Sequence, residues 1–142
     1  AAHGKVLVLE NCPYSHLPKG KMTQEIVHRV NSPALKMLWD PGNSYRAEVT
    51  QVPEKWLGLR LEEEFQTVKD DIGHMHLKNY HYDDTKAKPF VHVGMLEGDI
   101  DYGSLLPKMA QLDAAISLEP ELEPDACVRD MDVLVQEARK LT

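Results

Sequence analysis

Four short apolar segments of this chain each run into a side chain that can bind a metal ion. The segments are VLVLEN with Glu10, LKMLWDPGN with Asp40, HMHLKN with His76 and AAISLEPE with Glu119. Enzymes built on parallel barrels place their chemistry at the carboxyl ends of the strands, which is where all four residues fall. The recurrence predicts a single site assembled from repeated strand–helix units, although an eight-unit barrel would need twice as many.

The stretches between these segments carry apolar residues at helical spacing, which is the alternation of a parallel sheet flanked by helices. Thr23 is the predicted N-cap of the first helix, and Pro53 is expected in the first turn of the second. A long polar loop is expected from Tyr80 to about Asp99, and Asp125 is expected to cap the last helix. The predicted fold is therefore α/β, with four parallel strands and flanking helices.

Strand parity decides which side chains can meet, because alternate residues of a strand point to opposite faces of the sheet. In each predicted strand, alternate residues form a set that shares one face of the sheet. The candidate ligand is the last residue of its set, or nearly the last. Three carboxylates and one imidazole on one face favour a bound divalent cation, since buried carboxylates are costly without compensation. Mn²⁺, Mg²⁺ or Co²⁺ suits these ligands, and Zn²⁺ is compatible with them. The sets are Val6, Val8 and Glu10; Lys36, Leu38 and Asp40; His74, His76 and Lys78; and Ala115, Ser117 and Glu119.

The charge and composition of the chain limit the kinds of partner that it can bind. The formal charge is −7 and no basic stripe is present, which argues against nucleic acid or an anionic membrane as a partner. No apolar run approaches the roughly 18 residues of a membrane span, so a cytoplasmic protein is expected. Cys12 and Cys127 lie in different units without CxxC spacing, and both are expected to be free thiols.

Five segments in order carry a family resemblance: LVLEN, SPALKMLWDPGN, HMHLKN, LEGDIDYGSLL and ISLEPE. Together they resemble the C-terminal half of xylose isomerase-like TIM-barrel proteins, the superfamily of sugar phosphate isomerases and epimerases. The resemblance implies a (βα)4 half of a TIM barrel, with residues 1–142 forming one half-barrel unit, strands five to eight with their helices. It also implies that the N-terminal half is absent from this chain.

Carried over to this sequence, the resemblance implies that Glu10, Asp40, His76 and Glu119 bind one divalent metal ion. It implies further that Glu10 and Glu119 act as catalytic acid and base in an isomerase or epimerase. Such an enzyme moves a proton next to a carbonyl of a small sugar or polyol, through a metal-stabilised enediolate.

Three further residues are candidates for contact with the substrate. Lys78 lies two residues beyond His76 on the same face, and His81 lies in the expected long loop. Asn43 occupies a place where ketose 3-epimerases usually carry a histidine that contacts substrate. Two other positions have no expected role in catalysis: His74 is expected in the barrel core, and Glu121 is expected on the surface.

Two alternatives remain open. A dehydratase or lyase of the same superfamily, acting on a sugar or inositol derivative, would use the same metal and base. The chain could also be a non-catalytic fragment or half-subunit, because four parallel strands leave two edges unpaired. A second chain or an N-terminal segment is therefore expected to complete the barrel. A DNA-repair nuclease is disfavoured, since that branch needs several more histidine and aspartate ligands.

Overall fold

The computed structural model describes residues 3–47, 49–119 and 121–140, which fall into two compact units. The first unit runs from the start of the described chain to His76 and includes Ala114–Ser117. The second comprises Leu77–Asp113 and the described residues from Leu118 onward. The chain therefore leaves the first unit near the end of one strand and returns to it for a short segment.

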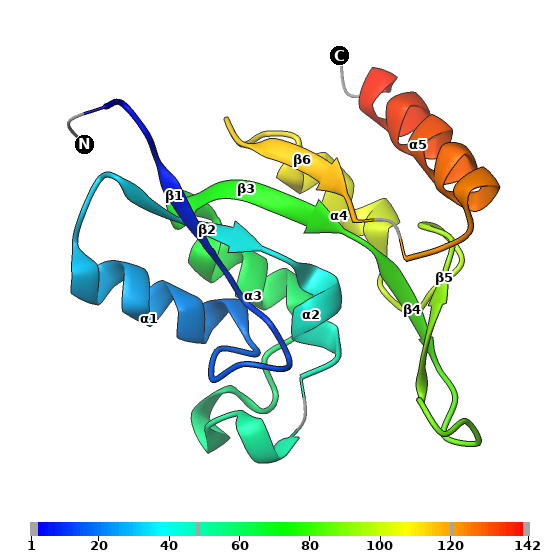
Figure 1. Cartoon of the computed structure of the whole chain (residues 1–142), viewed down its shortest axis with the longest axis horizontal. Helices are drawn as coiled ribbons and strands as arrows, with labels where there is room; N and C mark the ends of the chain where they lie inside the picture. The colour runs from blue at the N-terminus through cyan, green and yellow to red at the C-terminus, as the bar shows by residue number, and fades with distance from the viewer. Residues whose placement is uncertain (1–2, 48, 120, 141–142) are drawn as a thin grey trace. The chain divides into compact units, whose positions relative to one another are not determined.

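The strands that the sequence predicts alternate with helices, and an additional hairpin of β4 and β5 stands between β3 and α4 (Figure 1). In chain order the helices and strands are β1 Leu7–Glu10, α1 Gly20–Val30, β2 Leu35–Trp39, α2 Pro41–Tyr45, η1 Val49–Gln51, η2 Glu54–Trp56, α3 Leu61–Val68, η3 Lys69–Asp71, β3 Ile72–Leu77, β4 Asn79–Tyr82, β5 Phe90–Val93, α4 Tyr102–Met109, β6 Ala115–Leu118 and α5 Pro124–Arg139.

The first unit is built on a four-stranded sheet in the order β1-β2-β3-β6. β1 pairs with β2 in parallel from Leu7↔Leu35 to Glu10↔Leu38, and β2 pairs in parallel with β3. All four strands run in the same direction (Figure 1), which confirms the predicted sheet of four parallel strands with flanking helices. Parallel strands bring their carboxyl ends to one edge, so the ends of β1, β2 and β3 are neighbours.

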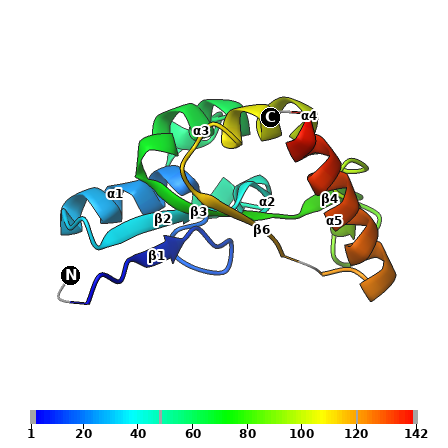
Figure 2. The ribbon, with the colours of Figure 1, turned by 90° about the horizontal axis from the view of Figure 1, so that it is seen from above.

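Helices α1 and α3 cover one face of the strands β1, β2 and β3 (Figure 2). Trp39 and Met75 of the strands are completely buried beneath these helices, together with Phe65 and Val68 of α3. The indole of Trp39 also donates a hydrogen bond to the buried carboxylate of Glu64, at 3.1 Å. One set of alternate residues in β2 and β3 therefore faces the helices, and the other set faces the opposite side of the sheet.

A bulge at Gly73 sets the orientation of β3. Met37 pairs with Ile72 but Leu38 pairs with His74, so Gly73 is an extra residue in the ladder. A Cβ atom at Gly73 would lie 2.8 Å from Cβ of Lys36, which leaves no room for a side chain. Beyond the bulge Met75 and Leu77 are completely buried, so by alternation His74 and His76 point to the face away from the helices.

The second unit contains an antiparallel hairpin of β4 and β5 together with α4 and α5. The hairpin pairs Asn79 with Val93 and Tyr82 with Phe90, so the predicted long loop from Tyr80 to Asp99 is wrong in its first half. The completely buried ring of Tyr80 packs edge-on against Phe90, with ring centroids 6.4 Å apart. The polar residues Asn79 and His81 alternate with tyrosines in β4, which conceals the strand pattern.

Three predicted helix boundaries are also wrong. Helix α5 begins at Pro124 with Glu123 as N-cap, so Asp125 lies inside the helix and does not cap it. Helix α1 begins at Gly20 with Lys19 as N-cap, so Thr23 lies buried inside the helix. The second predicted helix does not start at Pro53: the short η2 turn follows that proline, and α3 begins only at Leu61. In the described part of the chain, no helix combines the length and the apolar character needed to cross a bilayer.

Candidate metal centre

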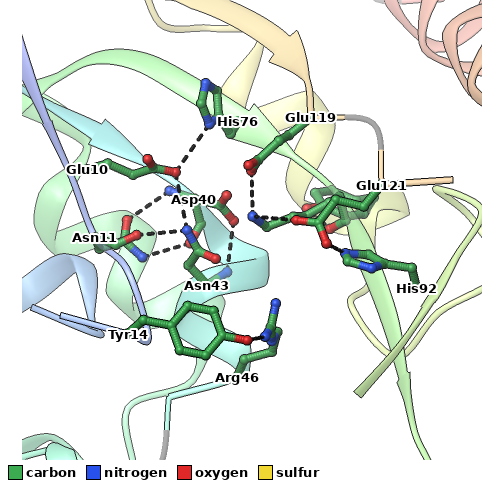
Figure 3. A network of polar contacts seen from close by, with 12 residues as sticks. Glu10, Asn11, Tyr14, Asp40, Asn43, Arg46, His76, His92, Glu119 and Glu121 are labelled. Carbon is green, nitrogen blue, oxygen red and sulfur yellow. Dashed lines mark hydrogen bonds and ion pairs between the residues drawn. The ribbon is translucent and has the colours of Figure 1, made fainter. Parts of the chain in front are cut away.

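The first unit brings together three of the four predicted ligands. Glu10 is the last residue of β1, Asp40 follows β2, and His76 lies one residue before the end of β3. A carboxylate oxygen of Glu10, a carboxylate oxygen of Asp40 and a ring nitrogen of His76 lie within 4.8 Å of one another. Nδ1 of His76 is 3.2 Å from Oε1 of Glu10 (Figure 3). The carboxyl ends of three adjacent parallel strands therefore converge as the sequence predicts.

Asp40 is the most deeply buried member of this group, with no exposed surface. Its side chain caps the short helix α2, since Oδ1 accepts a hydrogen bond from the backbone N–H of Asn43 at 2.8 Å. A carboxylate so removed from water is expensive unless positive charge compensates it. Two carboxylates and one imidazole are oxygen-rich ligands that fit Mg²⁺ or Mn²⁺ and are compatible with Zn²⁺.

Asn43, a predicted substrate contact, is nearly buried and bonds to its neighbours at this site. Its Nδ2 donates to Oε1 of Glu10 at 3.2 Å and to the backbone oxygen of Asn11 at 2.9 Å. The amide therefore orients the Glu10 carboxylate, and contact with a substrate stays a prediction.

Asn11 is a residue that the sequence did not single out. Its side chain is completely buried and bonds to Asp40 and to Ser44. It directly follows Glu10 in the LEN segment, but a buried amide at a strand end leaves no periodic pattern. Its contacts with residues far along the chain become visible only in the folded unit.

His74 lies beneath the three ligands on the same face of the sheet. Its Nε2 is 2.7 Å from Oγ of Ser117, and its ring meets His76 edge-on with centroids 5.3 Å apart. Burial, reinforced by His76 and opposed by Glu10, holds the pKa of His74 below its usual range. The residue therefore favours its neutral form, as expected of a histidine in the core rather than of a solvated one.

The second unit holds a cluster of charges around Lys78. Nζ of Lys78 lies 2.5 Å from Oε2 of Glu119 and 3.8 Å from Oε1 of Glu121. Oε2 of Glu121 is in turn 2.9 Å from Nε2 of His92 (Figure 3). Glu121, expected on the surface, is thus part of an ion-pair network, although its side chain keeps 40% of its exposure.

His81 and Asp99 order the hairpin of the second unit. Nδ1 of the exposed His81 lies 3.0 Å from Oδ1 of Asp99, whose second oxygen accepts from the backbone N–H of Tyr82. Asp101 caps α4 by accepting from the backbone N–H of Ser104. Substrate contact by His81 stays a prediction.

In this protein, acidic side chains and a histidine lie at the C-terminal ends of the parallel strands. This arrangement is typical of the class of barrel proteins that build their sites at that edge of the sheet. The family described as xylose isomerase-like TIM barrel matches residues 1–139, and the chain belongs to that family. This confirms the resemblance found in the sequence. No curated protein matches the chain.

Solved structures share the fold at low sequence identity. A probable 3-DHS dehydratase, AsbF, from Bacillus anthracis has 22% identity and a TM-score of 0.71, over 99% of this chain and 50% of its own. A xylose isomerase-like TIM barrel protein from Mycobacterium smegmatis in complex with magnesium has 17% identity and a TM-score of 0.75, over 99% of this chain and 46% of its own.

The 3-keto-D-glucoside 4-epimerase YcjR from E. coli, in its apo form, has 14% identity and a TM-score of 0.67, over 95% of this chain and 47% of its own. This chain therefore spans about half the length of the structures it resembles. The similarity confirms the half-barrel architecture predicted from the sequence.

Proposed function

We propose that this chain carries the metal-binding half of a divalent-metal-dependent sugar isomerase or epimerase. The observation that carries the proposal is the convergence of Glu10, Asp40 and His76 at the carboxyl ends of three adjacent strands. Glu119 is the proposed fourth ligand, since it lies two residues beyond Ser117, whose hydroxyl contacts His74 on that face. The family and its magnesium-containing member support the choice of a divalent ion.

The proposed chemistry moves a proton on a carbon next to a carbonyl of a small sugar or polyol. Glu10, Asp40, His76 and Glu119 would hold the metal ion, which polarises the carbonyl and stabilises negative charge on oxygen. Glu10 and Glu119 exchange the proton with the substrate as base and acid. Lys78 supplies a fixed positive charge beside Glu119, and Asn43 and His81 are proposed to contact substrate hydroxyls.

A dehydratase or lyase is the second candidate. The structures that share the fold include a probable dehydratase as well as an epimerase. Removal of the same proton can be followed by loss of water from the neighbouring carbon, without a change in the metal ligands. Product analysis distinguishes the two reactions, because isomerisation conserves the mass of the substrate and dehydration lowers it by one water.

A further four strand–helix units are proposed to complete the barrel, in the same polypeptide or in a partner chain. The outer strand β1 supports this proposal, because Leu7 is 70% exposed and Val8 is 44% exposed. An exposed apolar edge of a parallel sheet normally pairs with further strands. The length of the related structures agrees, since this chain matches 46% to 50% of each.

The proposed function is tested with Glu119→Gln in the assembly that contains the completed barrel. In D2O with Mn²⁺, the unaltered protein should exchange solvent deuterium into a ketose, and Glu119→Gln should abolish the exchange while it keeps the fold. The matched control is Glu54→Gln in the η2 turn, which should leave exchange intact. Retained exchange in Glu119→Gln would remove that residue from the acid–base role.

A further inference from the structure

The amide side chain of Asn11 replaces a rung of the ladder between β1 and β2. The last paired residues of that ladder are Glu10 and Leu38. Beyond them, Oδ1 of Asn11 accepts from the backbone N–H of Asp40 at 2.9 Å, and Nδ2 donates to the backbone oxygen of Asp40 at 2.8 Å. The side chain therefore bonds to Asp40 as a peptide group of a neighbouring parallel strand would.

The same amide reaches helix α2. Nδ2 of Asn11 also donates to Oγ of Ser44 at 3.0 Å, so both of its hydrogens and its oxygen are bonded. Ser44 Oγ accepts a further bond from the backbone N–H of Gly20, at 3.3 Å. Asn11 thus fixes the main chain of Asp40 from one side and the helix that follows it from the other.

Asn43 links this network to the second carboxylate. Its backbone N–H bonds to Oδ1 of Asp40, while its Nδ2 bonds to the backbone oxygen of Asn11 and to Oε1 of Glu10. Asn43 therefore joins the carboxylates of Glu10 and Asp40, and Asn11 holds this link in place through the main chain of Asp40 and the side-chain amide of Asn43. Among carboxylate and amide side chains, asparagine alone combines a donor and an acceptor at this reach, because an ionised aspartate cannot donate and glutamine is one carbon longer.

We propose that Asn11 is a positioning residue, which sets the separation and direction of the Glu10 and Asp40 carboxylates for a divalent metal ion. This inference rests on the proposed function. Residues that orient metal ligands in this way typically change metal affinity about 10- to 100-fold when they are removed. Asn11 itself is not a ligand in this arrangement, because all of its polar atoms are bonded to protein.

The test measures Mn²⁺ binding by titration calorimetry in the assembly that contains the completed barrel, alongside urea unfolding. Asn11→Ala should lower Mn²⁺ affinity about tenfold or more. The matched control is Gln24→Ala, because Gln24 is also a buried amide in the first unit and bonds to the backbone oxygen of Thr67 and to Asp71. This control should lose a similar amount of stability and keep its Mn²⁺ affinity.

A second readout needs no metal. In the metal-free chain, the amide proton of Asp40 should exchange with solvent faster in Asn11→Ala than in the unaltered protein, because its acceptor is gone. Should Asn11→Ala fail to fold, Ser44→Ala removes one of the three contacts and should lower Mn²⁺ affinity by about two- to tenfold, the value of one hydrogen bond.

The outcomes separate the inference from the function on which it rests. If the unaltered assembly binds no Mn²⁺, the proposed function fails and the inference fails with it. If the unaltered assembly binds Mn²⁺ and folded Asn11→Ala binds it equally well, only the inference is overturned. An equal loss of affinity in Gln24→Ala would also overturn it, since the effect would then come from general destabilisation.

Discussion

Nζ of Lys78 lies 2.5 Å from Oε2 of Glu119, and the lysine side chain is only 5% exposed. An ammonium group at this distance from a carboxylate forms a charge-assisted hydrogen bond, which is shorter and stronger than a neutral one. The backbone oxygen of Lys78 also accepts from the hydroxyl of Tyr102 at 2.8 Å, so its main chain is fixed as well. Lys78 therefore presents a positive charge beside a proposed acid–base residue with little freedom to move.

Lys78→Met is predicted to lower kcat about 100-fold or more and to leave Mn²⁺ affinity nearly unchanged. The reason is that a fixed charge aimed at developing negative charge contributes to the transition state, and loss of one such group costs about 10²–10³ in rate. Steady-state kinetics and calorimetry measure the two quantities. Lys86→Met, at the exposed tip of the hairpin, is the control, and an unaltered kcat in Lys78→Met would contradict the role.

Asp40→Asn is predicted to remove the stabilisation that Mn²⁺ gives to the fold. A ligand at 100 times its dissociation constant stabilises the folded state by about 2.7 kcal/mol, provided that it binds only that state. The completely buried Asp40 carboxylate is a proposed ligand, so its loss should reduce this increment to near zero. Urea unfolding with and without Mn²⁺ measures the increment. Asp84→Asn at the hairpin tip should retain it, and its persistence in Asp40→Asn would contradict the site.

The strands and their ligand-bearing ends could be predicted because buried parallel strands read as continuous apolar runs. Parity then predicted which residues share a face, and the contact of Glu10 with His76 and that of His74 with Ser117 both follow it. Local pattern was sufficient here because each strand needs only its own alternation. The parallel order of the strands then brings their ligand-bearing ends together at one edge of the sheet.

Other features depend on contacts between residues distant in the sequence. The hydrogen bonds of Asn11 reach residues 29 and 33 positions away, and nothing in the local pattern of the strand requires them. The local pattern does not predict the hairpin of β4 and β5, because its polar residues alternate with tyrosines. Packing in the folded unit, rather than intrinsic strand propensity, makes this segment a strand. Glu121 is expected on the surface because it has no place among the predicted metal ligands, and its contacts with Lys78 and His92 become visible only in the folded second unit.

Gly73→Ala is predicted to destabilise the fold by about 1–3 kcal/mol, the usual cost of overpacking a well-filled site. The added methyl group would meet Cβ of Lys36 at 2.8 Å across the bulge. Gly58→Ala is the matched control, because a Cβ atom there would meet nothing within 4 Å. Urea unfolding compares the two variants. Equal stability would show that the bulge tolerates a side chain and does not fix the position of His74 and His76.

The stability of the metal-free protein is predicted to fall on acidification because of His74. Burial and the neighbouring His76 lower the pKa of His74 in the folded state, while the unfolded chain titrates near the ordinary value of about 6.5. Between these two values the unfolded chain binds more protons than the folded one, so stability is present above about pH 6.5 and is lost as the pH falls through the folded-state pKa. Urea unfolding in chelator-treated buffer at a series of pH values measures the slope of the free energy of unfolding against pH. His74→Asn should reduce it, and an equal slope in that variant would show that other groups cause the loss.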